Sequence, residues 1–148
     1  MDNTLVKAQI DLNAIAHNVN ALRRLTHPEA KLMAVVKADG YGHGAIPVAK
    51  TALENGAGWL GVARIEEALA LREAGITAPI LVLGYTLPRL TPLLVENDIA
   101  QTVTSFAAAN AYQEALQLNG AKLRVHLKID TGMGRLGMVP DFGRNSLT

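Results

Sequence analysis

Five short apolar runs, separated by four segments with helical spacing, fill the sequence between residues 31 and 129. The runs are LMAVV (32–36), WLGVA (59–63), PILVLG (79–84), IAQTV (99–103) and LRVHLKI (123–129). The segments between them cover residues 44–55, 65–74, 88–96 and 105–118. Strands that alternate with helices predict a parallel sheet covered by helices, either an open doubly wound sheet or a (β/α)8 barrel.

A complete barrel of this kind needs eight strands and about 250 residues. The 148 residues of this chain supply five strands, so a barrel would be present as an arc with unpaired outer edges. Before the arc, residues 5–10 alternate in polarity as a half-buried strand does. A helix is expected next, because Asp11 can cap its start and Arg23 and Arg24 suit its C-terminal end.

The composition supports a folded domain and excludes several classes of function. Hydrophobic residues make up 49% of the chain and charged residues 18%, which is enough apolar material for one core. The net charge is +1 and the basic residues are scattered, so we expect neither a nucleic acid nor a membrane as partner. The chain has no cysteine, and its four histidines lack metal-ligand spacing, so we assign no metal. Without a signal-like or membrane-spanning apolar stretch, we expect a cytoplasmic protein with a small-molecule partner.

Lys37 is the first candidate for chemistry, because it stands at the C-terminal end of an apolar run in MAVVKADGYGHG. In parallel α/β folds, functional side chains come from the C-terminal ends of strands and from the loops that follow them. A lysine that emerges from an apolar strand is partly desolvated, which favours the neutral amine that forms Schiff bases. The alternative is a lysine that extends into solvent beside a simple glycine turn.

A second polar cluster accompanies the last apolar run, in HLKIDTGMGRLG. Alternation along the predicted strand places four polar side chains on one side: Arg124, His126, Lys128 and Asp130. Arg135 follows in the glycine-rich turn, and its planar guanidinium suits an oxyanion or a carboxylate better than a lysine would. The alternative for Lys128 and Arg135 is a solvated strand end with a glycine turn.

Two of these segments resemble a known enzyme family. VVKADGYGHG is similar to the cofactor-lysine signature of the alanine racemases, and HLKIDTGMGRLG resembles a second segment of that family. Both occur in the family's order with intervening strands that fit, so the resemblance covers residues 1 to about 138. It implies a pyridoxal 5'-phosphate-dependent racemase on a (β/α)8 TIM-type barrel, present here as a partial barrel of about five parallel strands with flanking helices.

The resemblance implies roles for individual residues. Lys37 would form the Schiff base with pyridoxal phosphate and later act as the base for the D-enantiomer of the substrate. Tyr41 would donate a hydrogen bond to the cofactor phosphate. Arg135 would reach the phenolic oxygen of the cofactor and help hold the substrate carboxylate. Lys128 matches a lysine that many members carry as a carbamate, which orients that arginine.

Two further residues, Val35 and Leu83, would contribute apolar walls to the cofactor pocket. The reaction that the resemblance implies is the interconversion of L-alanine and D-alanine, which supplies D-alanine for peptidoglycan. It needs two acid/base groups, one on each face of the substrate Cα. In the family the second group is a tyrosine from the C-terminal domain of the other subunit of a head-to-tail homodimer.

The resemblance covers less than half of a family chain. We therefore expect residues 1–148 to form the N-terminal portion of the barrel domain, without the C-terminal β-domain, and to be inactive alone. Residues 139–148 form an atypical tail that lacks the periodicity of a further helix. Three alternatives stay open: a broad-specificity amino-acid racemase, a non-catalytic pyridoxal-phosphate-binding barrel protein, and a non-functional gene remnant.

Overall fold

Five parallel strands form the central sheet of the computed structural model, which describes residues 6–116, 120–141 and 146–147. They lie in chain order: β1 (Leu32–Val35), β2 (Ala57–Val62), β3 (Ile80–Val82), β4 (Ile99–Val103) and β5 (Val125–Leu127). A doubly wound sheet reverses its strand order at a switch point, whereas the strands of a (β/α)8 barrel follow one another. The sheet is therefore an arc of a TIM-type barrel, and the predicted fold class is confirmed.

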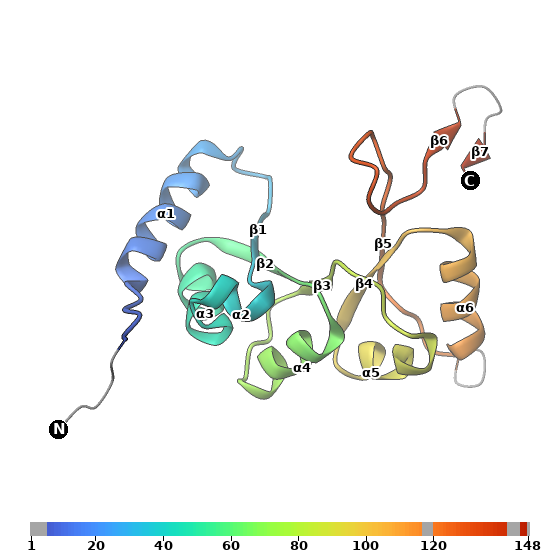
Figure 1. Cartoon of the computed structure of the whole chain (residues 1–148), viewed down its shortest axis with the longest axis horizontal. Coiled ribbons are helices and arrows are strands. Elements are labelled where there is room, and N and C mark those ends of the chain that lie inside the picture. The colour runs from blue at the N-terminus through green and yellow to red at the C-terminus, as the bar shows by residue number, and fades with distance from the viewer. Residues whose placement is uncertain (1–5, 117–119, 142–145, 148) are drawn as a thin grey trace.

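Helices follow one another around the outside of this sheet (Figure 1). Their bounds are α1 (Leu12–Leu25), α2 (Lys37–Gly42), α3 (Ala45–Glu54), α4 (Ile65–Glu73), the 3-10 helix η1 (Pro88–Leu90), α5 (Thr91–Glu96) and α6 (Phe106–Leu116). The helix expected over residues 88–96 is divided between η1 and α5, because Pro88 and Pro92 each stand in the first turn of a helix. None of the described helices is long and apolar enough to cross a bilayer. In the tail, β6 (Pro140–Asp141) pairs antiparallel with β7 (Ser146–Leu147).

Helix α1 begins where the sequence predicts. Asp11 Oδ1 accepts hydrogen bonds from the backbone N–H groups of Asn13 and Ala14, at 2.8 and 3.2 Å. The strand predicted over residues 5–10 is wrong: residue 5 lies outside the described residues, residues 6–10 form no strand, and Val6 is 86% exposed. An alternating segment becomes a strand only when a neighbour takes up its backbone hydrogen bonds, and no described strand pairs with this one.

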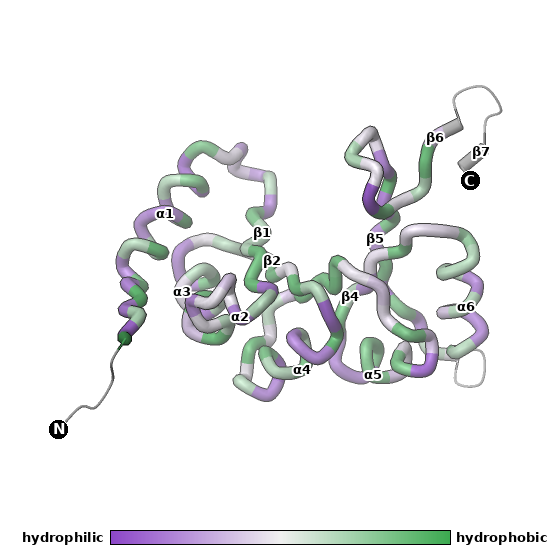
Figure 2. Tube along the Cα trace, in the orientation of Figure 1, coloured by the Kyte–Doolittle hydropathy of each residue, from purple (hydrophilic) through white to green (hydrophobic). Residues whose placement is uncertain are grey.

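The core lies between the sheet and the helices that cover it. Its buried side chains come from both layers: Val36, Ala49, Leu60, Val62, Ile65, Ala68, Leu71, Ile76, Ile80, Val82, Leu94 and Ile99. In Figure 2, β1 and β2 are accordingly hydrophobic, whereas α1 alternates between hydrophilic and hydrophobic residues. Strand β4 is buried throughout, but Val125 and Leu127 of β5 are 45% and 64% exposed. The buried part of the sheet therefore extends from β2 to β4, whereas no residue of β1 is fully buried.

The opposite face of the sheet carries the alternate residues of the same strands. A Cβ on Gly61 would lie 3.1 to 3.4 Å from three side chains of this face: Met33, Val35 and Leu83. Further across, the rings of Trp59 and His126 meet edge to face, with centroids 5.3 Å apart. Because side chains alternate along a strand, Lys128 lies on the same face as His126. The C-terminal end of this face is thus where the polar residues of interest can meet.

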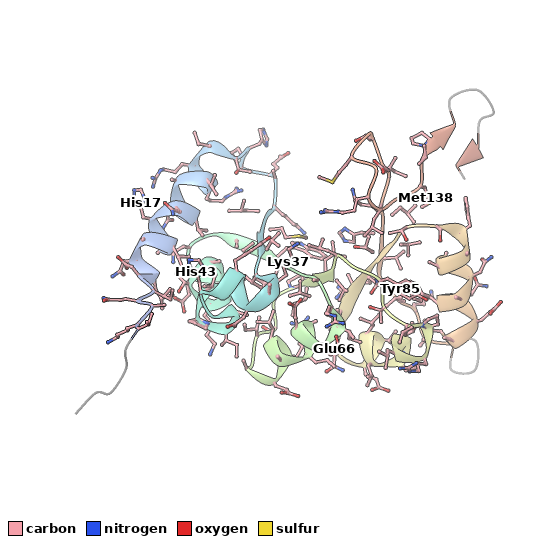
Figure 3. The ribbon with its side chains drawn as sticks, in the orientation of Figure 1. His17, Lys37, His43, Glu66, Tyr85 and Met138 are labelled. Carbon is pink, nitrogen blue, oxygen red and sulfur yellow. The ribbon has the colours of Figure 1, made fainter. Side chains whose placement is uncertain are left out.

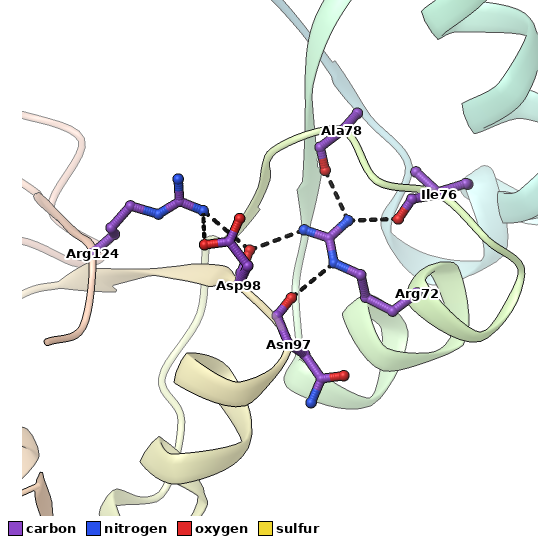
Figure 4. Close-up of polar contacts among 6 residues, drawn as sticks. All are labelled: Arg72, Ile76, Ala78, Asn97, Asp98 and Arg124. Atoms are coloured by element: carbon purple, nitrogen blue, oxygen red, sulfur yellow. Dashed lines mark hydrogen bonds and ion pairs between the residues drawn. The ribbon is translucent and has the colours of Figure 1, made fainter. Parts of the chain in front are cut away.

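Arg72 joins the N-terminal ends of two strands (Figure 4). Its guanidinium donates hydrogen bonds of 2.7 to 2.9 Å to four backbone carbonyls, those of Ile76, Ala78, Asn97 and Asp98. The first two carbonyls precede β3 and the other two precede β4. One side chain therefore fixes the entry of the chain into two neighbouring strands, at the end of the barrel that serves stability.

We expect Arg72→Met to lower the free energy of unfolding by about 2–3 kcal/mol, because several carbonyls lose a charged donor at once. Urea denaturation measures this change. Arg89→Met is the matched control, because Arg89 is exposed on η1 and should tolerate the same replacement. Equal stability of the two variants would contradict the bridging role of Arg72.

Candidate functional site

A cavity of about 300 Å³ lies at the C-terminal ends of the strands. It is lined by Lys37, Ala63, Leu83, Gly84, Thr102, Lys128, Met133, Arg135 and Leu136. Three of these nine residues are cations and none is acidic, so the cavity favours an anion. Figure 3 shows Lys37 near the middle of the molecule, where β1 ends, whereas His17 lies out on α1.

Lys37 is followed by a turn of left-handed backbone. The four residues Ala38, Asp39, Gly40 and Tyr41 have φ between 51° and 62° and ψ between 35° and 51°. This conformation costs a non-glycine residue roughly 1–2 kcal/mol, and only Gly40 avoids the cost. The turn brings the Tyr41 ring back to Lys37, whose Nζ lies 5.8 Å from the ring centroid.

Hydrogen bonds hold the left-handed turn in place. Asp39 Oδ1 accepts from the backbone N–H of Ala45 at 2.7 Å, which satisfies a donor in the first turn of α3. His43 Nδ1 lies 3.1 Å from the carbonyl oxygens of both Gly40 and Tyr41. Because both partners are acceptors, His43 carries a proton on Nδ1 and donates it to them. The strain of the turn is thus offset by bonds from the residues that follow it.

The carboxylate of Glu67 in α4 joins the ends of β1 and β2. Its Oε1 accepts from the N–H of Ala38 at 2.7 Å. Its Oε2 accepts from the N–H groups of Ala63 and Arg64, at 2.6 and 3.1 Å. Ala38 follows Lys37 directly and Ala63 lines the cavity, so this one side chain fixes the spacing of two cavity walls.

The segment after β5 closes into a loop that carries Arg135. The N–H of Asp130 donates to the carbonyl of Met138 at 2.9 Å, and the N–H of Met138 donates to the carbonyl of Lys128 at 2.8 Å. A Cβ on Gly137 would lie 2.8 Å from the backbone nitrogen of Asp130. The loop can therefore close at this point only with a glycine.

Within the same loop, the Asp130 carboxylate is a backbone acceptor. Its Oδ1 accepts from the N–H groups of Gly132 and Gly134, at 2.9 and 3.1 Å. These two bonds are the main reason that the pKa of the Asp130 carboxyl lies below its ordinary value, with a smaller contribution from the charge of Lys128. The ionised carboxylate thus shapes the turn that presents Arg135.

A buried polar network holds the loop after β3. Gln101 is fully buried; its Nε2 donates to the carbonyl of Gly84 at 2.7 Å, and its Oε1 accepts from Thr86 Oγ1 at 2.6 Å. The Tyr112 hydroxyl donates to the carbonyl of Thr86 at 3.0 Å, and burial raises the pKa of this phenol, which keeps it protonated. A Cβ on Gly84 would lie 2.5 Å from the carbonyl oxygen of Ala63, so the cavity wall leaves no room for a side chain there.

Thr102 lines the cavity from β4 and is only 6% exposed. Its Oγ1 is buried, and within the described part of the chain it has no hydrogen-bond partner. A buried hydroxyl without a partner destabilises a fold by about 1–3 kcal/mol. The neighbouring Gln101, in contrast, has a partner for both of its side-chain atoms.

The structure brings together four of the six residues that the sequence singled out: Lys37, Leu83, Lys128 and Arg135 line one cavity. Tyr41 and Val35 are not among the lining residues. Tyr41 lies beside Lys37 but is 60% exposed, and Val35 lies on the same face of the sheet with 39% exposed. The chemical roles of all six residues stay predictions.

The structural roles of several contributors to the site were not found from the sequence. A glutamate at the third position of a predicted helix is a capping signal, which could have pointed to Glu67. An aspartate two residues before a glycine favours a turn, which could have pointed to Asp130. The sequence holds no comparable signal for Gln101 and Thr102, because polar residues inside an apolar run do not reveal their partners.

Two larger cavities lie elsewhere. One of about 500 Å³ lies beside α6 and β5 and is mostly apolar, and one of about 520 Å³ lies between α3 and the segment before β3. Neither is lined by a residue that the sequence singled out as a site residue. No three His, Cys, Asp or Glu side chains are grouped as a metal site in the described ranges. The cavity at the strand ends is therefore the candidate site.

Comparison with known proteins identifies a family. The sequence matches the family model described as alanine racemase, N-terminal domain, over residues 10–144. An alanine racemase from Desulfosudis oleivorans is 58% identical over 131 residues, which cover 88% of this chain and 34% of that relative. The chain thus spans about a third of the length of the curated relatives it matches.

Solved structures share the same arrangement of strands and helices. An alanine racemase from Bacillus anthracis with bound L-Ala-P matches with a TM-score of 0.81 at 44% identity, covering 88% of this chain and 34% of that chain. A histidine racemase from Leuconostoc mesenteroides matches with a TM-score of 0.81 at 36% identity, covering 86% of this chain and 34% of that chain. This arc of a barrel is therefore common to racemases named for different amino acids.

We expect Glu67→Ala to accelerate hydrogen exchange at the amides of Ala38 and Ala63, because both lose their acceptor. The free energy of unfolding should fall by about 1–3 kcal/mol. Exchange followed by NMR, together with urea denaturation, measures both effects. Glu66→Ala is the control, because this neighbour on α4 is exposed; the same acceleration in both variants would refute the specific role of Glu67.

The Asp130 loop should respond to acid. The pKa of Asp130 in the folded chain lies below its ordinary value of 3.8. The stabilisation that the ionised Asp130 carboxylate gives to the folded loop is therefore complete above pH 3.8 and is lost as the pH falls below that value. The amide resonances of Gly132 and Gly134 should therefore shift together on titration from about pH 5 to 2. In Asp130→Asn that joint shift should be absent, and its persistence would point to another titrating group.

Proposed function

Because the chain belongs to the family of the alanine racemase N-terminal domain, we propose that it is the N-terminal portion of a pyridoxal-phosphate-dependent alanine racemase. Such an enzyme interconverts L-alanine and D-alanine in the cytoplasm and supplies D-alanine for peptidoglycan. The observation that carries this proposal is the cavity at the strand ends, where Lys37, Lys128 and Arg135 meet without an acidic residue in the lining.

The residues that line the cavity fit pyridoxal phosphate in charge and shape. Lys37 supplies an amine for the aldehyde, and Arg135 supplies a planar donor for an oxyanion. Leu83, Met133 and Leu136 supply apolar surface for an aromatic ring. The volume of about 300 Å³ is at the lower end of the range for small-ligand pockets.

Each residue then has a task in the reaction. Lys37 would hold the cofactor and, once the amino group of the substrate has taken its place and freed its amine, would remove the Cα proton of D-alanine, while Arg135 would orient the substrate carboxylate. Tyr41, close to Lys37 and exposed, would donate to the cofactor phosphate. When bound, pyridoxal phosphate supplies the electron sink for the charge that develops on Cα. Val35 lies on the same face of the sheet and adds apolar wall.

Lys128 and Arg135 line the same cavity as two cations, which repel each other. A carbamate on Lys128 would turn the repulsion into an ion pair and hold the arginine in place. Racemisation also needs an acid/base group on the second face of Cα, and one lysine serves one face. We assign that group to the partner subunit of a homodimer, in which this arc is part of a longer chain.

A second candidate is a racemase for another amino acid on the same fold. The observation that favours it is the match to the histidine racemase, whose similarity to this chain extends over the same region. A third candidate, a cofactor carrier without catalysis, needs Lys37 but no arginine aimed at a substrate carboxylate. The lining of the cavity by Arg135 therefore favours a racemase over a carrier.

Incubation with pyridoxal phosphate, reduction with borohydride and peptide mapping should place a pyridoxyl group on Lys37. Lys37→Ala should lose this label, and Lys50→Ala, which removes an exposed lysine of α3, should retain it. A label spread evenly over the lysines of the wild-type chain would remove the basis of the proposal.

A longer chain that contains this arc distinguishes the three candidates, because residues 1–148 alone lack the proposed second acid/base group. The optical activity of L-alanine and L-histidine is followed in separate reactions, with entry of solvent deuterium at Cα measured by mass spectrometry. Turnover of alanine supports the alanine racemase, and turnover of histidine alone would replace the substrate. A longer chain, labelled at Lys37, that exchanges no Cα proton of either amino acid would favour the carrier.

A further inference from the structure

The buried hydroxyl of Thr102 is a polar group with no task in the fold. Among the described residues, it is the buried side-chain oxygen that lacks a hydrogen-bond partner. Backbone pairing with β3 and β5 already positions β4, so the side chain is not needed to hold the strand. A valine would fill the same space without leaving a polar atom unpaired.

Thr102 shares its cavity with the groups that the proposed function uses. Lys37, Lys128 and Arg135 line the cavity together with Thr102, while the remaining lining side chains are apolar or absent. Rotation about one bond exchanges the hydroxyl and methyl groups of a threonine, so the hydroxyl can turn to a group that enters. Thr102 is then the single neutral hydrogen-bond donor of the nine lining side chains.

The chemistry of the aldehyde identifies the acceptor. In pyridoxal phosphate, the carbon that condenses with an amine is attached next to the ring carbon that bears the hydroxyl oxygen. Condensation at Lys37 therefore brings this oxygen into the same cavity. Surrounding cations favour its ionised form, and an ionised oxygen is a strong acceptor for a hydroxyl donor.

Resting on the proposed function, we propose that the Thr102 hydroxyl donates a hydrogen bond to the ring oxygen of pyridoxal phosphate and is a cofactor-binding residue of this site. The carboxylate of the amino acid is the other oxyanion that could enter the cavity. Thr102 and Lys37 line the same cavity, and the ring oxygen lies beside the position at which the lysine condenses, so we take the ring oxygen as the acceptor.

Thr102→Val and Thr102→Ser test this proposal by binding rather than by turnover. We expect Thr102→Val to raise the dissociation constant of pyridoxal phosphate roughly tenfold, and Thr102→Ser to stay near the wild-type value. Without cofactor, Thr102→Val should melt at the wild-type temperature or roughly 3 °C higher, because it removes an unpaired polar atom. Thr77→Val, an exposed threonine before β3, is the control and should change neither quantity.

An analogue identifies the atom. 3-Deoxypyridoxal phosphate keeps the aldehyde but lacks the ring oxygen, so wild type and Thr102→Val should bind it equally. A tenfold difference that persists with the analogue, or a dissociation constant for pyridoxal phosphate unchanged in Thr102→Val, would overturn the proposal. The proposal would also be overturned if Thr102→Val bound pyridoxal phosphate normally and lost affinity only for added alanine. That result would show that the Thr102 hydroxyl binds the carboxylate of the amino acid.

The outcome is separable from that of the proposed function. Borohydride labelling of Lys37 in the wild-type chain reports on the proposed function alone. A wild-type chain that takes up no pyridoxal phosphate overturns both proposals. A chain labelled at Lys37, with equal affinity for pyridoxal phosphate in wild type and Thr102→Val, overturns only the role of Thr102.

Discussion

Three backbone N–H groups at the ends of β1 and β2 converge on the carboxylate of Glu67. Parallel strands end in unpaired donors, and these donors would otherwise bind water and let the strand ends move apart. By accepting from both strand ends, the carboxylate fixes where the chain leaves the sheet and where Lys37 therefore stands. The geometry of the candidate site therefore depends on this contact.

The two ends of the sheet are stabilised in different ways. At the N-terminal end, Arg72 binds four carbonyls with one fixed cation. At the C-terminal end, Gln101 and Tyr112 hold the β3 loop with neutral groups buried in the fold. A cationic clamp beside the cavity would compete for the anion that the cavity favours, whereas neutral amide and phenol groups, like the anionic carboxylate of Glu67, do not. The chemistry of each clamp thus suits its end of the sheet.

The fold was predictable from the sequence because the apolar runs alternate with helical segments in a regular order. The convergence of Lys37, Lys128 and Arg135 was predictable for the same reason, since the C-terminal ends of parallel strands share one edge. The strand prediction for residues 5–10 is wrong, because an alternating polarity pattern indicates which residues could be buried but not whether a partner strand exists. The roles of Glu67 and Thr102 were not predicted from the sequence, because these roles depend on contacts between distant parts of the chain.

The left-handed turn after Lys37 has the hand that a chain of D-residues would take without strain. Because the backbone of the turn has the mirror-image hand, no ordinary L-residue in place of Ala38 relieves its strain. Glycine would relieve the strain but would also make the turn more flexible. A D-alanine placed at position 38 by chemical synthesis would keep the shape and relieve the strain. An insertion or deletion within these few residues would rotate the Tyr41 ring away from the lysine, so the length of this segment is as constrained as its composition.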